Sequence, residues 1–449
     1  MGVAYAFARP PNIVQGGDFN AFYCAARILP TAADPYRYEP LHTCESRNVR
    51  PLTPRFVVPA PLPPYALALL VPLAQLSYHR AALAWCLLLL ASAILTVWAL
   101  VELTGIPVLI VAVCVLSATL FQALNWGGLT PVPIALLCGA AVAITRSRWA
   151  IASILFGFAC IEPHIALPSM LATFVLIPAM RFRLIVLLGA IAILSIGSGG
   201  IWLNYEYPTM VLPAQALSEI GYSAQYGLSP LLHTFGWADR PALLMGGAQY
   251  AVFAIGGVWL ARALKGRIPE AVVLAPMALC VLGGTYVHLV QVAGASLPLA
   301  LVVAARTRSA WAWLGVALLS VPWHYADKSN AVLLAGVVVL VLASHVRRVG
   351  PVGAVLVAGF FAVAFWEFQK LEPSVHISEV APIPSSALAQ AGWKEFAVQV
   401  PPNLYTCVSH VPTYVGLVIV VWGVLALAPR KPISLLSHYA PLEGPGGSS

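Results

Sequence analysis

Apolar segments of about twenty residues recur along this chain and decide what it can fold into. Residues 81–103 and 184–203 are two examples. Such a segment can cross a hydrocarbon core of roughly 30 Å, and only as a helix, because lipid offers no partner for a free backbone amide. Of the 449 residues, 60% are hydrophobic and only 9% are charged, against roughly 25% charged in soluble domains. Together with a mean hydropathy of +0.86, this predicts an all-α polytopic membrane protein.

Hydropathy divides the chain into about thirteen predicted transmembrane helices. They lie at 81–103, 106–123, 130–145, 149–162, 165–180, 184–203, 241–262, 270–285, 287–304, 310–323, 329–345, 350–367 and 411–428. Residues 63–78 are also apolar but open with Pro63-Pro64, so we predict a juxtamembrane helix against the outer interface. The predicted domains are an outer-face loop with this helix (1–80), a transmembrane domain (81–428) and a cytoplasmic tail (429–449). The end of the tail is a flexible segment or a cloning remnant.

The positions of the cations orient these helices, because cytoplasmic loops of membrane proteins carry the excess of Lys and Arg. Alternating spans place the internal cation clusters on one face, which we predict to be cytoplasmic. The clusters are Arg146/Arg148, Arg181/Arg183, Arg262/Lys265/Arg267, Arg306/Arg308, Arg347/Arg348 and Arg430/Lys431. The long loops 1–80, 204–240 and 368–410 then face outward. The chain also starts on the outer face without a preceding span, so a first helix either lies upstream or is absent from this protein.

Charge and cysteine content limit the partners and the compartment. The net charge of +8 comes from short clusters between apolar segments, which is a topology signal and predicts no nucleic-acid partner. Most of the eight cysteines lie in apolar segments and are interpreted as small buried hydrophobic residues. Cys44 and Cys407 lie in polar outer loops instead. They can pair if the loops share an oxidising compartment, a point that the sequence leaves open.

Asp18 is the first candidate for chemistry. It follows two glycines and precedes an aromatic run in Gln15-Gly-Gly-Asp-Phe-Asn-Ala-Phe-Tyr23. This pattern predicts a helix that starts close to Asp18, where the side chain is either a helix cap or a general base facing the membrane surface. Asp34, in Ala-Asp-Pro-Tyr, is interpreted as a turn residue with a structural role.

Glu162 and His164 form a second candidate group in Ile-Glu-Pro-His, at the outer end of a predicted span. Ionisable residues at membrane depth are costly and usually functional, although a polar helix end that meets solvent explains the same pattern. Three further turns are predicted on the outer face. Their candidate residues are Asn125, Tyr286, His288, Trp323, Tyr325 and Lys328. Trp323 and Tyr325 suit a sugar-binding platform, and an interfacial aromatic belt is the alternative explanation.

Several motifs are missing, and their absence narrows the class of enzyme. The chain has no glycine-rich nucleotide loop, no Gly-x-Ser-x-Gly elbow and no His-Glu-x-x-His motif, each of which would mark a different chemistry. It also has no predicted cytoplasmic domain for a nucleotide-sugar donor. An enzyme whose site faces outward therefore needs a donor that reaches the outer face in the lipid phase.

The order of several motifs resembles a known family. Gly-Gly-Asp18-Phe with Tyr23-Cys-Ala-Ala, then Asp34-Pro-Tyr, then Pro63-Pro-Tyr-Ala-Leu before an apolar helix, is similar to glycosyltransferase family 87. That family belongs to the C-type superfamily of polyprenyl-phosphate-sugar enzymes and includes mannosyltransferases that extend phosphatidylinositol mannosides. Ala224-Gln225-Tyr-Gly-Leu-Ser resembles the family's Asn-Gln-Ser segment. A Lys-Pro pair common in the family is Glu162-Pro163 here, and the first spanning helix is absent.

The resemblance implies a C-type glycosyltransferase fold and an inverting EC 2.4 enzyme of the cell inner or plasma membrane. Its site would lie on the periplasmic or extracellular side, and a monosaccharide, mannose or another pentose or hexose, would pass to a glycolipid or glycan acceptor. Asp18 would be the catalytic base. The donor phosphate would be held by His288, His164 and Lys328, and the substrates by Glu162, Asn125, Tyr286, Gln225, Trp323 and Tyr325.

No cofactor or metal site is predicted, although some members of the superfamily bind a divalent metal. The main alternative is a transporter or flippase of a lipid-linked sugar, which should carry polar groups near the middle of several spans. Another outward-facing lipid-modifying enzyme, such as an acyl or phosphoethanolamine transferase, would need a nucleophile or metal constellation that the sequence lacks. The sequence leaves open the sugar, the acceptor, the linkage and the oligomeric state.

Overall fold

The structure is a computed structural model that describes residues 17–31, 33–49, 55–222, 224–321, 323, 329–346, 349–369, 382–397 and 404–427. Within these ranges every regular element is a helix, and no strand is formed. The all-α prediction is therefore confirmed for the described part of the chain. Lys328 and Tyr325 lie outside it, as do the cation clusters at 347–348 and 430–431.

The core is built around α16 (Leu289–Thr307), which is almost entirely buried. Its neighbours are α15 (Ala271–Cys280), α17 (Ala310–Ser320), α21 (Leu404–Leu427) and α5 (Tyr78–Thr104). The remaining helices of the body are α6 (Val108–Val115), α7 (Phe121–Trp126), α8 (Pro131–Thr145), α9 (Trp149–Ala159), α10 (Pro163–Leu176), α13 (Leu228–Thr234) and α14 (Asp239–Leu264). Large apolar side chains on their outer faces, such as Leu83 and Ile94, stay exposed, as is expected of surfaces that contact lipid.

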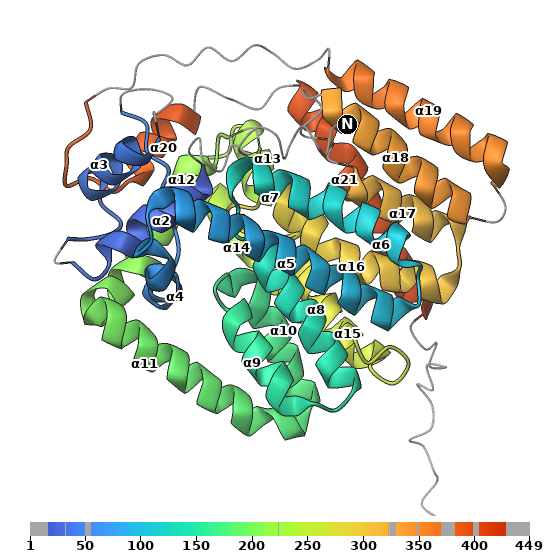
Figure 1. Ribbon diagram of the computed structural model, residues 1–449, viewed down its shortest axis with the longest axis horizontal. Helices are drawn as coiled ribbons and strands as arrows, with labels where there is room; N and C mark the ends of the chain where they lie inside the picture. The colour runs from blue at the N-terminus through green and yellow to red at the C-terminus, as the bar shows by residue number, and fades with distance from the viewer. Residues whose placement is uncertain are drawn as a thin grey trace, which may run out of the picture.

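Two helical units lie at opposite edges of the body (Figure 1). One is the pair α18 (Ser329–His345) and α19 (Gly350–Gln369), whose two helices pack against each other. The other is α11 (Arg181–Glu206), most of whose apolar side chains are exposed. Near Gly199, α11 contacts Pro64 of the small helix α4 (Pro64–Ala74). The segment predicted as a juxtamembrane helix, residues 63–78, thus contains a helix, α4.

Six helical stretches in the described part of the chain are long and apolar enough to cross a membrane. They are Tyr78–Thr104, Val108–Trp126, Pro178–Glu219, Asp239–Leu264, Leu289–Thr307 and Ser409–Leu427. Helices also occupy the other predicted spans, but several are short. α9 has 11 residues and α15 has 10, and at 1.5 Å per residue α15 is about 15 Å long. The number of thirteen spans stays a prediction.

The predicted loop 204–240 begins later than expected. α11 kinks at Gly200, where φ is +62°, and then continues through a π-helical turn at Tyr207–Val211 into α12 (Leu212–Glu219). The prediction placed the end of the helix at the first polar residues, Asn204 and Glu206. The helix continues because both find partners: Asn204 bonds to the Ser195 carbonyl at 2.8 Å, and Glu206 pairs with Arg37.

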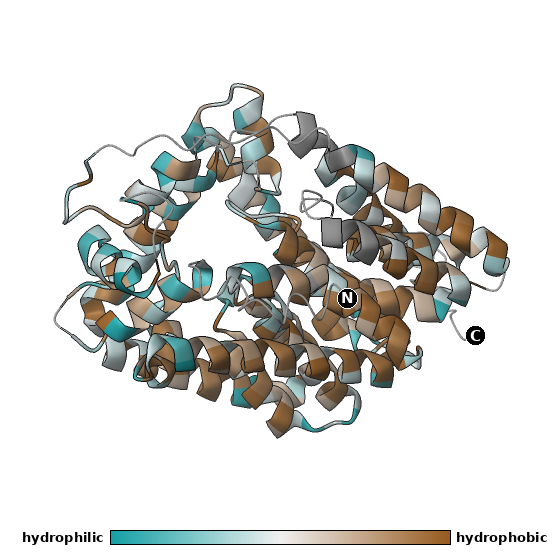
Figure 2. Ribbon diagram, turned by 45° about the horizontal axis from the view of Figure 1, so that its top comes forward, coloured by the Kyte–Doolittle hydropathy of each residue, from teal (hydrophilic) through white to brown (hydrophobic). Residues whose placement is uncertain are grey.

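The outer segment forms a small helical layer over one end of the body. It contains α2 (Asp18–Ile28), α3 (Tyr38–Asn48), α4 and, from the distant loop, α20 (Gln390–Ala397). Hydrophilic residues gather at this end, whereas the long helices are mostly hydrophobic (Figure 2). The helix predicted to begin near Asp18 is confirmed. Asp34 is a turn residue, as predicted: its carboxylate accepts hydrogen bonds from the Tyr36 amide and from Arg37, both within 3 Å.

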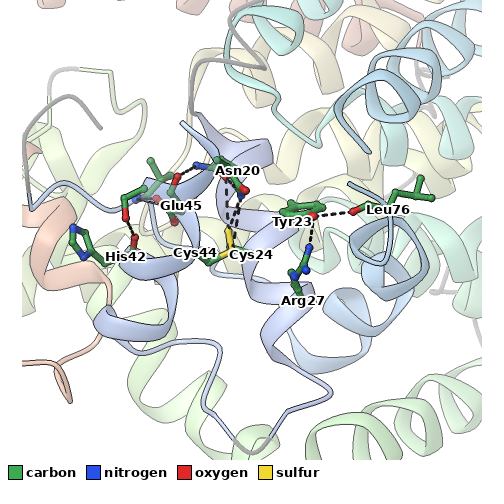
Figure 3. The surroundings of a disulfide bond; sticks show 11 residues. Asn20, Tyr23, Cys24, Arg27, His42, Cys44, Glu45 and Leu76 are labelled. Carbon is green, nitrogen blue, oxygen red and sulfur yellow. Dashed lines mark hydrogen bonds between the residues drawn. A yellow bond between two sulfur atoms is a disulfide. The ribbon is translucent and has the colours of Figure 1, made fainter. Parts of the chain in front are cut away.

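A disulfide joins α2 to α3 through Cys24 and Cys44, whose Cα atoms lie 5.7 Å apart (Figure 3). The pairing considered from the sequence, Cys44 with Cys407, is therefore wrong. Cys24 was overlooked because it lies in the apolar run of α2 and was grouped with the buried hydrophobic cysteines. Next to the disulfide, Asn20 donates to the Glu45 carbonyl at 3.2 Å, and Tyr23 donates to the Leu76 carbonyl at 2.8 Å. These contacts fix α2 against α3 and the start of α5.

We expect the disulfide to stabilise the outer layer measurably. It closes a loop with a sequence separation of 20, for which chain entropy gives a stabilisation of about 3 kcal/mol. The double variant Cys24→Ser/Cys44→Ser should therefore unfold at a lower temperature, whereas Cys86→Ser, at a half-buried free thiol, should not. Maleimide tagging of the unfolded parent protein should gain two labels after reduction. No gain on reduction would show that the bond does not form.

Two arginines of the predicted cytoplasmic clusters form ion pairs at the ends of helices of the body. Arg146 at the end of α8 pairs with Glu102 near the end of α5 at 2.5 Å, and Arg306 near the end of α16 pairs with Glu270 at 3.0 Å. α5, α8 and α16 all begin at the opposite end, beneath the outer layer. Arg146 and Arg306, which belong to two of the predicted cytoplasmic clusters, thus lie away from the segment that carries Asp18.

Candidate active site

Four helices begin close together where the outer layer meets the helical body. The residues immediately before them are Gly17 for α2, Thr130 for α8, Glu162 for α10 and His288 for α16. A helix N-terminus carries free backbone amides and a partial positive charge. Where several meet, the site favours negatively charged groups.

Asp18 is held in place by two glycine contacts between α2 and the turn after α7. A Cβ atom on Gly17 would lie 2.3 Å from the Trp126 carbonyl oxygen. A Cβ atom on Gly127, whose φ is +74°, would lie 2.5 Å from the Phe19 Cβ atom. Trp85 fixes the turn by donating its indole N–H to the Gly127 carbonyl at 2.9 Å. The chain can approach this closely only because both positions lack a side chain.

The Asp18 carboxylate is half-buried and faces a mixed set of charges. Burial raises the pKa of Asp18 to about 6; the charge of His288 lowers it in part, and that of Glu219 raises it. A carboxylate in this range is ionised near neutral pH and can still accept a proton. That combination suits a general base.

Glu162 lies in the turn between α9 and α10 and is 8% exposed. The Thr130 hydroxyl donates to its Oε1 atom at 3.1 Å, while its Oε2 atom has no hydrogen-bond partner among the described residues. Burial raises the pKa of Glu162 to about 8, and the nearby Asp18 charge adds to that rise, whereas Thr130 and His288 oppose it. Glu162 therefore reaches neutral pH mostly protonated, with one oxygen free to bind a substrate.

His288 lies between Glu219 and Gln225. Its Nε2 atom is 3.0 Å from the Glu219 Oε2 atom and 2.9 Å from the Gln225 Nε2 atom. The Gln225 Oε1 atom accepts the Val287 amide at 2.7 Å, so the amide N–H₂ group of Gln225 is the part that faces Glu219. Burial disfavours the charged form of His288, but Glu219, Asp18 and Glu162 outweigh it and raise the pKa of His288.

His164 is joined to the same group through Gln291, the third residue of α16. The Gln291 Nε2 atom lies 3.1 Å from the His164 Nε2 atom, and the Gln291 Oε1 atom accepts the His288 backbone amide at 3.0 Å. His164 and His288, which the sequence analysis names as phosphate-binding candidates, are thus linked through Gln291.

Tyr286 completes the group on the side of the loop before α16. Burial raises the pKa of Tyr286, and the negative charges of Glu219 and Glu162 raise it further. Its half-buried ring is therefore close to both carboxyl groups. Phenol rings beside polar groups are common in ligand sites, because they combine a flat apolar face with a hydrogen-bonding tip.

The structure brings together most, but not all, of the predicted site residues. Asp18, Glu162, His164, Gln225, Tyr286 and His288 form one connected cluster. Asn125 donates to the Phe121 carbonyl of its own helix at 2.9 Å. Trp323 is 3% exposed and donates to the Leu318 carbonyl, so its ring is a core side chain and no open sugar platform. Tyr325 and Lys328 lie outside the described residues.

The cluster holds carboxyl groups and imidazoles, and in the described part of the chain no Lys or Arg forms an ion pair with it. No group of three or more potential metal ligands is found among the described residues. The sequence-based prediction missed three members: Glu219, Gln291 and Thr130. Glu219 lies far from His288 in sequence, and only its position as an isolated acid six residues before Gln225 could have drawn attention to it.

A bundle of apolar helices beneath a polar cap is typical of a multi-pass membrane protein, and its acid–histidine cluster is a candidate active site. The model of glycosyltransferase family 87 matches residues 62–287, about half of the sequence, so the chain belongs to that family and is a glycosyltransferase. The matched region contains Glu162, Glu219 and Gln225, whereas Asp18 precedes it and His288 is the next residue after it. No curated protein and no solved structure matches this chain.

Proposed function

We propose that this glycosyltransferase moves a monosaccharide from a polyprenyl phosphate to an acceptor hydroxyl, with inversion, at the cluster around Asp18. The observation that supports it best is the meeting of four helix N-termini around a half-buried carboxylate. These N-termini suit an anionic leaving group, and the carboxylate suits proton abstraction. The surrounding apolar helices suit a donor whose tail remains in the lipid.

Asp18 takes the proton of the acceptor hydroxyl as its oxygen attacks the anomeric carbon. The bond between that carbon and the phosphate oxygen breaks, and the electron pair leaves with the polyprenyl phosphate. Because this leaving group is already a stable anion, the reaction needs no general acid. Glu162, mostly protonated and with a free oxygen, binds a hydroxyl of the acceptor or of the transferred sugar.

Two features offset the missing lysine of the family's Lys-Pro pair. A charged carboxylate about 4 Å from a phosphate would cost about 1–4 kcal/mol at effective dielectric constants of 80 to 20, and a protonated Glu162 avoids most of this repulsion. His288 and the amides at the start of α16 supply the attraction instead. His288 is therefore the main protein contact of the phosphate in this proposal, with His164 behind it.

We place the cluster on the outer face of a cell inner or plasma membrane. Two independent features support this side: Arg146 and Arg306 lie at the opposite helix ends, and the disulfide in the outer layer suits an oxidising compartment. Labelling with a membrane-impermeant maleimide tests it. Phe235→Cys, at an exposed site beyond α13, should react in intact cells, whereas Arg148→Cys should react only after lysis. The reverse pattern would overturn the topology.

Release of free polyprenyl phosphate tests the donor class. Purified protein in lipid nanodiscs should release it from at least one polyprenyl-phosphate sugar when a glycolipid acceptor is present, and should release nothing from nucleotide sugars. Transfer from a nucleotide sugar alone would contradict the proposal. The same panel would identify the sugar, and mass spectrometry of the product would identify the acceptor.

A further inference from the structure

We infer that Glu219 is a positioning residue: its carboxylate contacts the His288 Nε2 atom and fixes the orientation of the His288 ring in the site. The inference rests on the proposed role of His288. Glu219 lies far from His288 in the sequence, and its contact with His288 gives a reason for a buried acid in this site.

The first argument is the number of donors that converge on Glu219, which is only 3% exposed. Gln215 donates to its Oε1 atom at 2.6 Å, and Gln225 donates to its Oε2 atom. His288 approaches the same Oε2 atom at 3.0 Å. These contacts hold the Glu219 carboxyl group in one orientation, so it is a fixed acceptor beside His288.

The second argument concerns the proton on His288. The amide group of Gln225 is oriented by the Val287 amide, so its N–H₂ group and the His288 Nε2 atom both point at Glu219. A carboxylate oxygen can only accept, and therefore the His288 Nε2 atom must carry a proton. The His288 side chain also accepts the backbone amide of Gln291, the third residue of α16, in a capping box. Contacts on two sides therefore fix the ring.

The third argument is that the arrangement is fixed from several sides. Gln390 of α20 donates to Gln215 at 3.2 Å, so the outer layer itself holds the residue that orients Glu219. The other charged and titratable groups near His288 are the carboxyl groups of Asp18 and Glu162 and the imidazole of His164, while the Tyr286 phenol lies near Glu219 and Glu162. Unlike these groups, Glu219 contacts the His288 ring directly.

The test measures the titration of His288 directly, without any substrate. Diethyl pyrocarbonate modifies the unprotonated imidazole, and the side chain of His288 is 34% exposed, so the reagent can reach it. The rate of modification of the His288 peptide, followed by mass spectrometry from about pH 5 to about pH 9, gives the midpoint of the titration. In the parent protein the midpoint should lie above the ordinary histidine value of about 6.5.

Removing the Glu219 charge should lower this midpoint. Glu219→Gln keeps the size of the side chain but loses the negative charge, so His288 should become reactive at a lower pH. Glu219→Asp keeps the charge and should recover part of the shift. The matched control is Glu270→Gln, which removes another buried carboxylate, paired with Arg306 at the opposite end of α16. Glu270→Gln should affect stability without moving the His288 midpoint.

A binding measurement connects the titration to the phosphate. At neutral pH, Glu219→Gln should weaken the binding of undecaprenyl phosphate by at least about tenfold, as expected for loss of a hydrogen bond to a charged group. Lower pH should restore the binding, because it protonates His288 without Glu219.

Identical His288 midpoints in the parent and in a folded Glu219→Gln protein would overturn the inference. A lowered midpoint with unchanged phosphate binding would keep the role of Glu219 in the protonation of His288 and reject His288 as the phosphate contact. Failure of the inference and failure of the proposed donor are therefore distinguishable.

Discussion

The Asp18→Asn protein is expected to fold normally and to lose at least about 100-fold of its glycosyl transfer, the usual scale for loss of a general base. The amide fits the same space at the first turn of α2 but cannot take the proton of the acceptor. Donor binding should remain, because the phosphate is held by His288 and the helix N-termini. Turnover in nanodiscs and a separate donor-binding assay measure the two effects.

The pH dependence gives this prediction a second readout. Asp18 must be ionised to act as a base, and its pKa is raised to about 6 by burial. Transfer by the parent protein should therefore fall as the pH drops through about 6, and the residual activity of Asp18→Asn should lack this limb. A raised carboxyl pKa also means that ionised Asp18 destabilises the folded state above its unfolded pKa. Asp18→Asn should thus unfold at the same or a higher temperature at neutral pH.

Asp239→Asn is the matched control. Asp239 is the first residue of α14, as Asp18 is of α2, but its side chain is 42% exposed and pairs with His233. This variant should retain full transfer. Near-normal transfer by a folded Asp18→Asn protein would reject Asp18 as the base and would make Glu162 the next residue to test.

The second large effect is expected from Gly127→Ala. The new Cβ atom would lie 2.5 Å from the Phe19 Cβ atom and 2.9 Å from its amide nitrogen, so α2 must move away from the turn after α7. The left-handed backbone at φ +74° adds about 1 kcal/mol of strain. A displacement of about 1 Å at a reacting group can cost 100-fold in rate, and Asp18 begins the helix that is displaced. We therefore expect both a lower unfolding temperature and a transfer rate reduced by about 100-fold.

Gly189→Ala separates this effect from a general intolerance of glycine substitution. Gly189 lies within α11, and a Cβ atom added there would have no atom within 4 Å outside its own helix backbone. Alanine there should be neutral or stabilising by roughly 0.5–1 kcal/mol. A Gly127→Ala protein with the activity and stability of Gly189→Ala would show that the close approach of α2 to this turn does not position Asp18.

The sequence predicted the elements better than the lengths of the helices. Apolar runs located the helices, and the glycines before Asp18 located the start of α2. Helix ends were less predictable where polar residues enter the bundle. α9 stops three residues before Glu162, inside the predicted span 149–162, whereas α11 continues past Asn204 because that side chain is satisfied within its own helix. Hydropathy alone does not distinguish these two situations.

The candidate site was predictable where its members share a short motif. Glu162 and His164 stand together at one helix start, and the structure places His288 beside them. Glu219 and Gln291 were not predictable, because their roles depend on contacts between separate helices. The same limit explains the disulfide: Cys24 follows an apolar pattern, and only the packing of α3 against α2 brings it to Cys44.

A structure of the Asp18→Asn protein with a polyprenyl-phosphate sugar bound tests the central claim most directly. The account predicts that the anomeric carbon lies beside position 18 and that the phosphate lies at the start of α16, in contact with His288 directly or through one water. The sugar should also reach the free oxygen of Glu162. A phosphate more than about 8 Å from His288, beyond one bridging water, or a sugar bound away from position 18, would contradict the account.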